Sequence, residues 1–233
     1  MLRPYLLISI SYTANRTDNG RGLVMVSLTS PAEQAGETRH EHRPPRHRLL
    51  RVAIGLLAGE GPQALSVRRV AAEAGCPTSV VYTTFGSREG LAEALYLEGF
   101  DGLRRRMEAV PAHPDPCAHL LELGRAYREY AIAEPLYYSI MFEKVIPGFA
   151  PSERARAVAG TSLHIIERAV ARCVATGGTR PADPTRIAEA LWAAAHGAIS
   201  LELSGHLTGP ATHDTVTTAV AHHYLDPPPA HPE

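Results

Sequence analysis

Apolar residues recur every three or four positions through most of the chain between residues 45 and 224. No stretch alternates apolar and polar residues in the way of a half-buried strand. Asp115 with Pro116, and Asp183 with Pro184, each combine a helix N-cap with a proline at the first helical position. The pattern therefore predicts an all-α fold of about nine helices.

Two short helices with a glycine between them are predicted within residues 66–85. Ser66 is placed as the N-cap of the first helix, and Gly75 is placed to end it because glycine readily adopts a left-handed backbone. The second helix begins at about Pro77 and has Val81 as its inward anchor. The apolar stripe of the first helix consists of Val67, Val70, Ala71 and Ala74. This pattern is typical of a helix-turn-helix, whose second helix fits the major groove of DNA.

Further helices are predicted on both sides of this motif. One covers residues 45–59, and a long one capped by Ser87 runs to about Met107 and links the motif to a second helical region. A later helix over residues 152–176 is expected to bury Ala157 and to end at the glycine pair that follows, Gly177 and Gly178.

Breaks in the apolar period suggest four parts of the chain. Residues 1–44 have no sustained period and are expected to be a disordered leader, with Met25 as an alternative start. Residues 45–106 are predicted to form a helix-turn-helix DNA-binding domain, and residues 107–225 a second helical domain. A proline-rich flexible tail is expected over residues 226–233.

The charge is unevenly divided, although the net charge of the 233 residues is only -1. From Arg43 to Arg106 there are 10 basic and 6 acidic residues, whereas from Met107 to Glu233 there are 9 basic and 14 acidic residues. A basic head on an acidic body fits DNA binding, and ordinary solvated surfaces also differ by this much. The basic run at residues 39–48 has two interpretations, a flexible arm that contacts DNA or a solvated leader.

Composition argues against several other classes of protein. The three cysteines, Cys76, Cys117 and Cys173, have neither a disulfide-framework nor a zinc-site spacing, which fits a reducing cytoplasm. No apolar run approaches the roughly 18 residues that a membrane helix needs. No acid–base pair, activated nucleophile or metal-binding group occurs on one predicted element, so we expect neither an enzyme nor a bound cofactor or metal.

The motif and its flanks resemble the N-terminal domain of TetR-type transcriptional regulators over residues 46–106. The resemblance is carried by Ser-Val-Arg-x-Val-Ala-x-x-Ala-Gly from Ser66, by Val-Tyr-x-x-Phe from Val81 and by Gly-Ser-Arg-x-x-Leu from Gly86. Residues 191–205, which contain a Trp-x-x-x-His-Gly sequence from Trp192, are similar to the C-terminal domain of one TetR subgroup. The resemblance implies a three-helix DNA-binding head, a long linking helix, and a helical domain for effector binding and dimerisation.

The resemblance also implies which residues contact DNA. Arg68 and Arg88, near helix N-termini, are expected beside phosphates, and Tyr82 is similar to a family tyrosine that contacts the DNA backbone. The hydroxyl side chains of the second motif helix are candidates for base-edge or phosphate contacts: Thr78, Ser79, Thr83 and Thr84. Two positions depart from the family: Pro77, expected at the first helical position, and Arg69, which either contacts phosphate or lies in solvent.

An effector pocket is expected in the second domain because the resemblance places its aromatic residues around a cavity. An ordinary core of the same residues is the alternative. The candidate lining residues are Tyr127, Tyr130, Tyr137, Tyr138, Met141, Phe142, Trp192 and His196. His196 has a further pair of interpretations, a pH or metal sensor or a hydrogen-bonded structural histidine. A homodimer seam is suited by a succession of small residues, Ala193, Ala194, Ala195, Gly197 and Ala198.

The sequence thus favours a cytoplasmic, bacterial, homodimeric transcriptional repressor. It is expected to bind a palindromic double-stranded DNA operator and to be released by a small, largely apolar effector. The alternative is a helical small-molecule-binding dimer that has lost DNA recognition.

Overall fold

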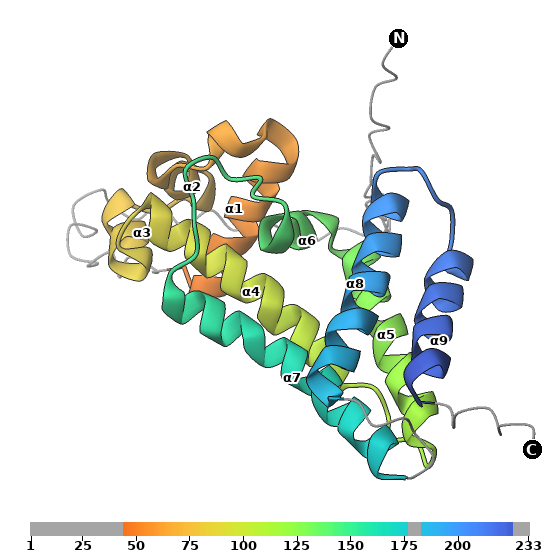
Figure 1. Cartoon of the computed structure of the whole chain (residues 1–233). Helices are drawn as coiled ribbons and strands as arrows, with labels where there is room; N and C mark the ends of the chain where they lie inside the picture. Colours follow the sequence, from red (N-terminus) through yellow and green to blue (C-terminus); the bar gives the residue numbers. More distant parts are fainter. Residues whose placement is uncertain (1–43, 177–182, 226–233) are drawn as a thin grey trace, which may run out of the picture. The chain divides into compact units, whose positions relative to one another are not determined.

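The computed structural model describes residues 44–176 and 183–225, which form nine α-helices, one 3-10 helix and no strand (Figure 1). The predicted all-α fold is therefore confirmed for this part of the chain. The predicted leader, apart from Pro44, lies outside the described residues, as do the tail and the glycine pair at residues 177–178. The predicted domain boundaries remain predictions.

The first four elements include the helix-turn-helix, which α2 and α3 form. Helix α1 carries a buried face of five residues and packs against α2, while α3 packs against α2 and α4 (Arg88–Glu108). The bounds of these elements are α1 Arg46–Glu60, η1 Pro62–Ala64, α2 Val67–Ala74 and α3 Thr78–Phe85.

Local chemistry sets the sharp turn between α2 and α3. The Ser66 hydroxyl accepts a hydrogen bond from the Arg69 backbone N–H at 3.3 Å, which caps α2 as predicted. Gly75 has a left-handed backbone, with φ 66° and ψ 37°, and its N–H donates to the Ala72 carbonyl at 3.1 Å. Val81 is fully buried on the inner face of α3. Pro77 corrects one prediction: it is the N-cap of α3, with extended backbone, and Thr78 takes the first helical position.

The long helix α4, Arg88–Glu108, begins immediately after the motif. Its predicted N-cap Ser87 accepts from the Gly90 N–H at 3.1 Å. A Cβ on Gly90 would lie 1.9 Å from the Phe85 carbonyl oxygen, so only glycine allows α4 to start this close to the end of α3. The position of the motif relative to α4 therefore depends on this glycine.

Five helices complete the described chain. Each of α5 and α8 opens with the predicted Asp–Pro pair, in which Asp115 and Asp183 accept backbone hydrogen bonds. In Figure 1, α8 and α9 lie side by side, and α7 runs beside α4. The bounds are α5 Pro116–Ala133, α6 Pro135–Phe142, α7 Glu153–Ala175, α8 Pro184–Leu203 and α9 Ala211–Leu225.

Two hydrophobic clusters form the core, and α4 contributes to both. Its first half lies in one cluster with α1, α2 and α3, and its second half lies in the other with α5, α7 and α8. The first cluster also includes Ile146, which is only 2% exposed and lies in the segment between α6 and α7. The sequence identified that segment as a loop but not its place in the core. Helix α7 buries Ala155 and Ala159 there, whereas Ala157, expected inward, is exposed.

A partly buried ion pair joins α5 to α8. Arg128 Nε donates to Glu202 Oε2 at 2.8 Å, and the side chains of the two residues are 16% and 13% exposed. The hydrogen bond from Arg128 lowers the pKa of the Glu202 carboxyl. The pair holds α8 in place beside α5.

Close packing of α4 on α5 requires a second small residue. The Tyr130 hydroxyl donates to the Gly99 carbonyl at 2.7 Å, and its ring lies over Gly102. A Cβ on Gly102 would lie 2.8 Å from Tyr130 Oη and 2.9 Å from Cε2. The ring has no room to accept a methyl group without moving.

We predict that Gly102→Ala lowers the free energy of unfolding by about 1–3 kcal/mol, because the methyl group displaces the Tyr130 ring and its hydrogen bond. Urea denaturation followed by circular dichroism measures the change. Gly55→Ala is the matched control, since its Cβ would meet nothing within 4 Å on exposed α1, and we expect stabilisation of about 0.5–1 kcal/mol. Equal effects of the two substitutions would contradict the packing argument.

Candidate DNA-binding surface and ligand cavity

Helix α3 presents a polar face opposite its buried anchor Val81. Thr78, Ser79 and Thr83 are exposed on this face, and the Tyr82 side chain is 53% exposed. Arg68 is exposed in the first turn of α2. These five predicted DNA-contacting residues are thus accessible, and their contacts with DNA remain predictions.

Two hydroxyl groups of α3 are already engaged with the backbone. Thr83 Oγ1 donates to the Ser79 carbonyl, and Thr84 Oγ1 donates to the Val80 carbonyl, each at 2.7 Å. A hydroxyl that donates to its own helix can still accept, and the threonine methyl groups remain available for apolar contact. Thr84 is also partly buried, so its side chain is less accessible than that of Thr83.

The two remaining arginine predictions have different outcomes. Arg88 Nε donates to the Leu65 carbonyl at 2.8 Å, and its Nη1 donates to the Pro147 carbonyl at 3.4 Å. Its guanidinium therefore ties the start of α4 to the motif and to the segment after α6, while the predicted phosphate contact stays untested. Arg69, for which phosphate or solvent was expected, forms an ion pair with Glu60 of α1.

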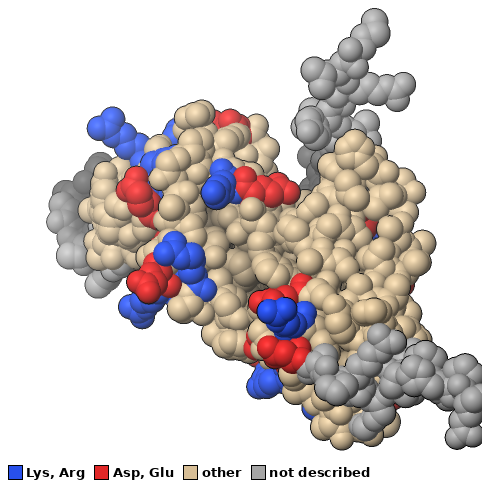
Figure 2. All heavy atoms as spheres, viewed as in Figure 1, with Lys and Arg blue, Asp and Glu red and all other residues tan. Residues whose placement is uncertain are grey.

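Charged side chains are distributed unevenly over the face in Figure 2. They gather over the motif and along α4 and α7, whereas the part of this face over α8 and α9 shows almost none. On α8, Trp192 is 39% exposed and Leu201 is 47% exposed, and the small residues Ala193 and Gly197 are exposed between them. This surface is more apolar than is usual for helices that face solvent.

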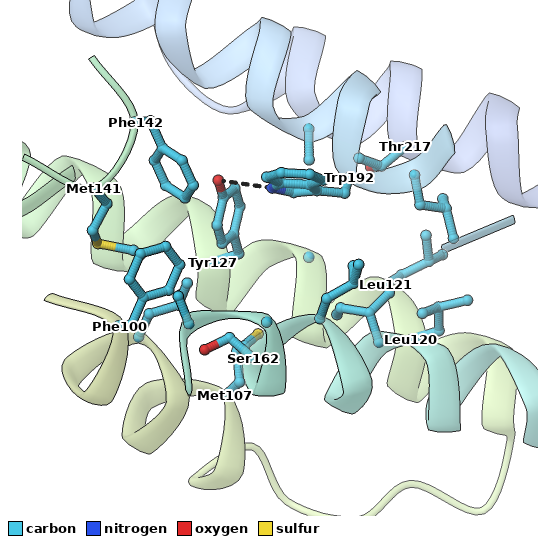
Figure 3. A pocket seen from close by; sticks show the side chains of 18 of the residues that line it. Phe100, Met107, Leu120, Leu121, Tyr127, Met141, Phe142, Ser162, Trp192 and Thr217 are labelled. Atoms are coloured by element: carbon cyan, nitrogen blue, oxygen red, sulfur yellow. Dashed lines mark hydrogen bonds between the residues drawn. The ribbon is translucent and has the colours of Figure 1, made fainter. Parts of the chain in front are cut away.

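A cavity of about 380 Å³ lies among α4, α5, α6, α7, α8 and α9. Figure 3 shows aromatic and aliphatic side chains from these helices pointing into it. From α4 it is lined by Tyr96, Phe100, Leu103 and Met107, and from α5 by Leu120, Leu121, Gly124 and Tyr127. From the other helices it is lined by Met141, Phe142, Ala159, Gly160, Ser162, Leu163, Ile166, Leu191, Trp192, Ala195 and Thr217.

Half of the predicted pocket residues line this cavity: Tyr127, Met141, Phe142 and Trp192. Tyr130, Tyr137, Tyr138 and His196 do not. Tyr130 bonds to α4, and Tyr137 packs beside Gly99 at a half-buried position. The aliphatic lining from α4, α5 and α7 was missed because the same residues at the same spacing build an ordinary core. The sequence feature that could have indicated a cavity is the pair of small residues on α7, Ala159 and Gly160.

Tyr138 and His196 instead form a hydrogen-bond network directly behind the cavity. His196 Nδ1 lies 2.7 Å from the Tyr138 hydroxyl and 3.2 Å from the Tyr127 hydroxyl. Trp192 Nε1 donates to the Tyr127 hydroxyl at 3.3 Å, as the dashed line in Figure 3 marks. Since tryptophan can only donate, the Tyr127 proton is free to point to Nδ1, which accepts in the neutral tautomer that carries its proton on Nε2.

Burial controls the ionisation of this network. It lowers the pKa of His196 below its ordinary value, against a smaller opposing effect of Glu143. Burial also raises the pKa of Tyr127 and Tyr138. The network is therefore uncharged at neutral pH, which fits the structural interpretation of His196.

The cavity offers a ligand almost no charge. None of its lining residues is acidic, basic or a histidine. In the described ranges no group of three or more His, Cys, Asp or Glu could hold a metal ion. None of the described helices has the length and apolar character to span a membrane.

Both halves of the described chain match models of known protein families. Residues 49–95 match the family model of "Bacterial regulatory proteins, tetR family", and residues 120–224 match "Tetracyclin repressor-like, C-terminal domain". The HTH-type transcriptional regulator Rv1816 of Mycobacterium tuberculosis is 25% identical over 203 residues, which cover 74% of this chain and 86% of that protein.

Solved structures of other proteins have a similar fold. A protein from Rhodococcus sp. RHA1 is 30% identical, with a TM-score of 0.66, over 80% of this chain and 96% of its own. The TetR family transcriptional regulator PfmR of Thermus thermophilus is 20% identical, with a TM-score of 0.58, over 75% of this chain and 96% of its own, and it shares the fold.

We predict that His196 titrates below its ordinary pKa of 6.5. The unfolded chain then binds a proton at a higher pH than the folded chain, so stability is lost as pH falls through 6.5 toward the folded pKa. NMR titration of the His196 ring and unfolding measurements between pH 7.5 and about 5 test this. His196→Asn should weaken the pH dependence of stability, and His206→Asn, at an exposed position, should leave it unchanged. A midpoint at or above 6.5 would refute the prediction.

Proposed function

Because the chain belongs to the TetR family of bacterial transcriptional regulators, we propose that it is a ligand-responsive repressor. It binds a palindromic operator as a homodimer in the bacterial cytoplasm, and a small, largely apolar effector releases it. The observation that supports this most directly is the combination in one chain of an exposed α3 in a helix-turn-helix and an apolar cavity.

Homodimer formation through α8 and α9 is supported by the nearly uncharged part of their surface that faces the viewer in Figure 2. The exposed Trp192 and Leu201, with Ala193 and Gly197 between them, allow two copies of α8 to approach closely. Two heads related by a two-fold axis can place their α3 helices in successive major grooves, about 34 Å apart. Membership of the Trp-His-Gly subgroup remains part of this proposal, carried by Trp192 and His196.

Coupling between cavity and DNA requires that the effector prefer one arrangement of the head over another. Two connections support this. Helix α4 lines the cavity with Phe100 and begins beside the motif, and α6 lines it with Phe142 and continues into the segment that holds Ile146. A ligand that separates α4 from α6 strains both connections. The effector thus favours a head spacing that no longer fits the operator.

The alternative, a small-molecule-binding dimer without DNA recognition, is favoured by one observation, the lack of any Lys or Arg within α3. Footprinting with the purified full chain on the DNA upstream of its own gene separates the two. Protection of a two-fold sequence supports the repressor, and no protected site anywhere in that DNA supports the alternative.

We predict that Arg68→Ala weakens operator binding and reduces the slope of log K against log salt by about 1, because one phosphate contact is lost. Electrophoretic mobility shifts at several salt concentrations measure the slope. Arg172→Ala, which removes an exposed cation near the end of α7, is the control and should not change it. An unchanged slope in Arg68→Ala would exclude a phosphate contact at this position.

Arg88→Ala should behave differently, because its guanidinium is bonded to the Leu65 and Pro147 carbonyls. We expect a loss of about 1–3 kcal/mol in the free energy of unfolding, with the salt slope of operator binding kept. Chemical denaturation and the same mobility-shift series measure both quantities. A reduced slope with unchanged stability would instead assign Arg88 to the phosphate backbone.

A further inference from the structure

The cavity sets a limit on the charge of its ligand. All of its lining residues are uncharged, and most are aromatic or aliphatic. An ionised carboxylate, phosphate or ammonium placed there would lose much of its hydration and gain no counter-ion, which lowers its affinity by at least about tenfold relative to an uncharged ligand. The ligand that fits this cavity is therefore uncharged.

Most of the polar groups in the lining are already engaged. Trp192 Nε1 donates to Tyr127, and the Tyr127 hydroxyl is shared with His196. Thr217 Oγ1 donates to the His213 carbonyl at 2.7 Å. A ligand would have to break one of these bonds to use the donor, which cancels most of the gain.

The hydroxyl groups of Tyr96 and Ser162 are the exceptions, and the Tyr96 ring packs against Phe149 in the first hydrophobic cluster. Ser162 is 6% exposed and lines the cavity from α7, yet within residues 44–176 and 183–225 its hydroxyl has no hydrogen-bond partner. Its neighbour Thr161, which faces solvent, donates to the Val158 carbonyl. The Ser162 hydroxyl is thus a donor and acceptor without a partner that remains accessible at the edge of an apolar space.

The surroundings of Ser162 leave room for a ligand atom beside its hydroxyl. Two and three positions earlier on α7 lie Gly160 and Ala159, whose small size opens the cavity along this helix. In Figure 3, Ser162 lies on the opposite side of the cavity from Phe142 and Trp192. A planar apolar body can contact those rings while a polar atom at its other end reaches Ser162.

We propose that the effector is an uncharged molecule with an apolar, ring-containing body and a single hydrogen-bonding group that is bound by the Ser162 hydroxyl. The proposal rests on the proposed function, since it specifies the chemistry of the same cavity. Ser162 determines specificity: it selects ligands with one hydroxyl or carbonyl over hydrocarbons of equal shape.

A thermodynamic cycle between ligand and residue tests this. The probes are 1-naphthol, its methyl isostere 1-methylnaphthalene, and 1-naphthoate, each measured by isothermal titration with the full chain at neutral pH. Ser162→Ala removes the hydroxyl with little change in volume. Thr161→Ala, which removes the adjacent solvent-facing hydroxyl, is the matched control.

We expect Ser162→Ala to shift the ratio of the dissociation constants of 1-naphthol and 1-methylnaphthalene by about fivefold in favour of the methyl compound. Thr161→Ala should keep the wild-type ratio. The charged 1-naphthoate should bind the wild-type chain at least about tenfold more weakly than 1-naphthol. An unchanged ratio in Ser162→Ala, equally tight binding of 1-naphthoate, or failure of all three probes to bind would overturn the proposal.

Operator binding, measured in parallel, separates this proposal from the proposed function. A chain that shows the Ser162-dependent ratio but binds no DNA refutes the repressor and keeps the ligand assignment. A chain that binds its operator but shows no such ratio refutes the ligand assignment and keeps the repressor.

Discussion

The rest of the structure depends on the packing of one helix, α4, into two hydrophobic clusters. Leu91 and Leu95 are completely buried with the motif helices, and Leu103 and Met107 are buried two to three turns further on with α5 and α7. A helix is stiff over this length, because each turn is held by backbone hydrogen bonds and by side chains interlocked with their neighbours. The head and the cavity wall therefore share one rigid element.

This sharing explains why the glycines of α4 lie where they do. Gly90 allows the helix to start against the end of α3, and Gly102 allows Tyr130 of α5 to lie against its backbone. Both contacts are between backbone or ring atoms that cannot easily move aside. The two ends of α4 are thus fixed closely to different partners, so a displacement at one end is passed to the other rather than absorbed.

The sequence predicted most of the fold because the signals that begin and end helices are local. Ser66, Ser87 and Asp115 cap the helices that they were expected to cap, and Gly75 has the left-handed backbone that the turn requires.

The candidate site was only half predictable from the sequence. Aromatic residues on α6 and α8 stood out, but aliphatic residues such as Leu120 carry the same pattern whether they fill a core or surround a hollow. The place of Ile146 and the bonds of Arg88 depend on contacts between distant segments, for which a single sequence gives no periodicity.

The arrangement of polar groups around the cavity is suited to a ligand switch. A lining made only of apolar residues would accept many hydrophobic molecules, because burial of apolar area does not discriminate strongly between shapes of similar size. The network of Trp192, Tyr127 and His196 satisfies its own hydrogen bonds, so it fixes the aromatic side of the cavity without attracting a particular ligand. Selectivity then falls to the unpartnered hydroxyl of Ser162 on α7, the helix that packs along α4.

A ligand bound between the Ser162 hydroxyl and the aromatic side of the cavity contacts α7, α6 and α8 together. Any change in the separation of these helices acts on the Phe100 region of α4. Recognition of the ligand and displacement of the head would therefore depend on the same helix contacts.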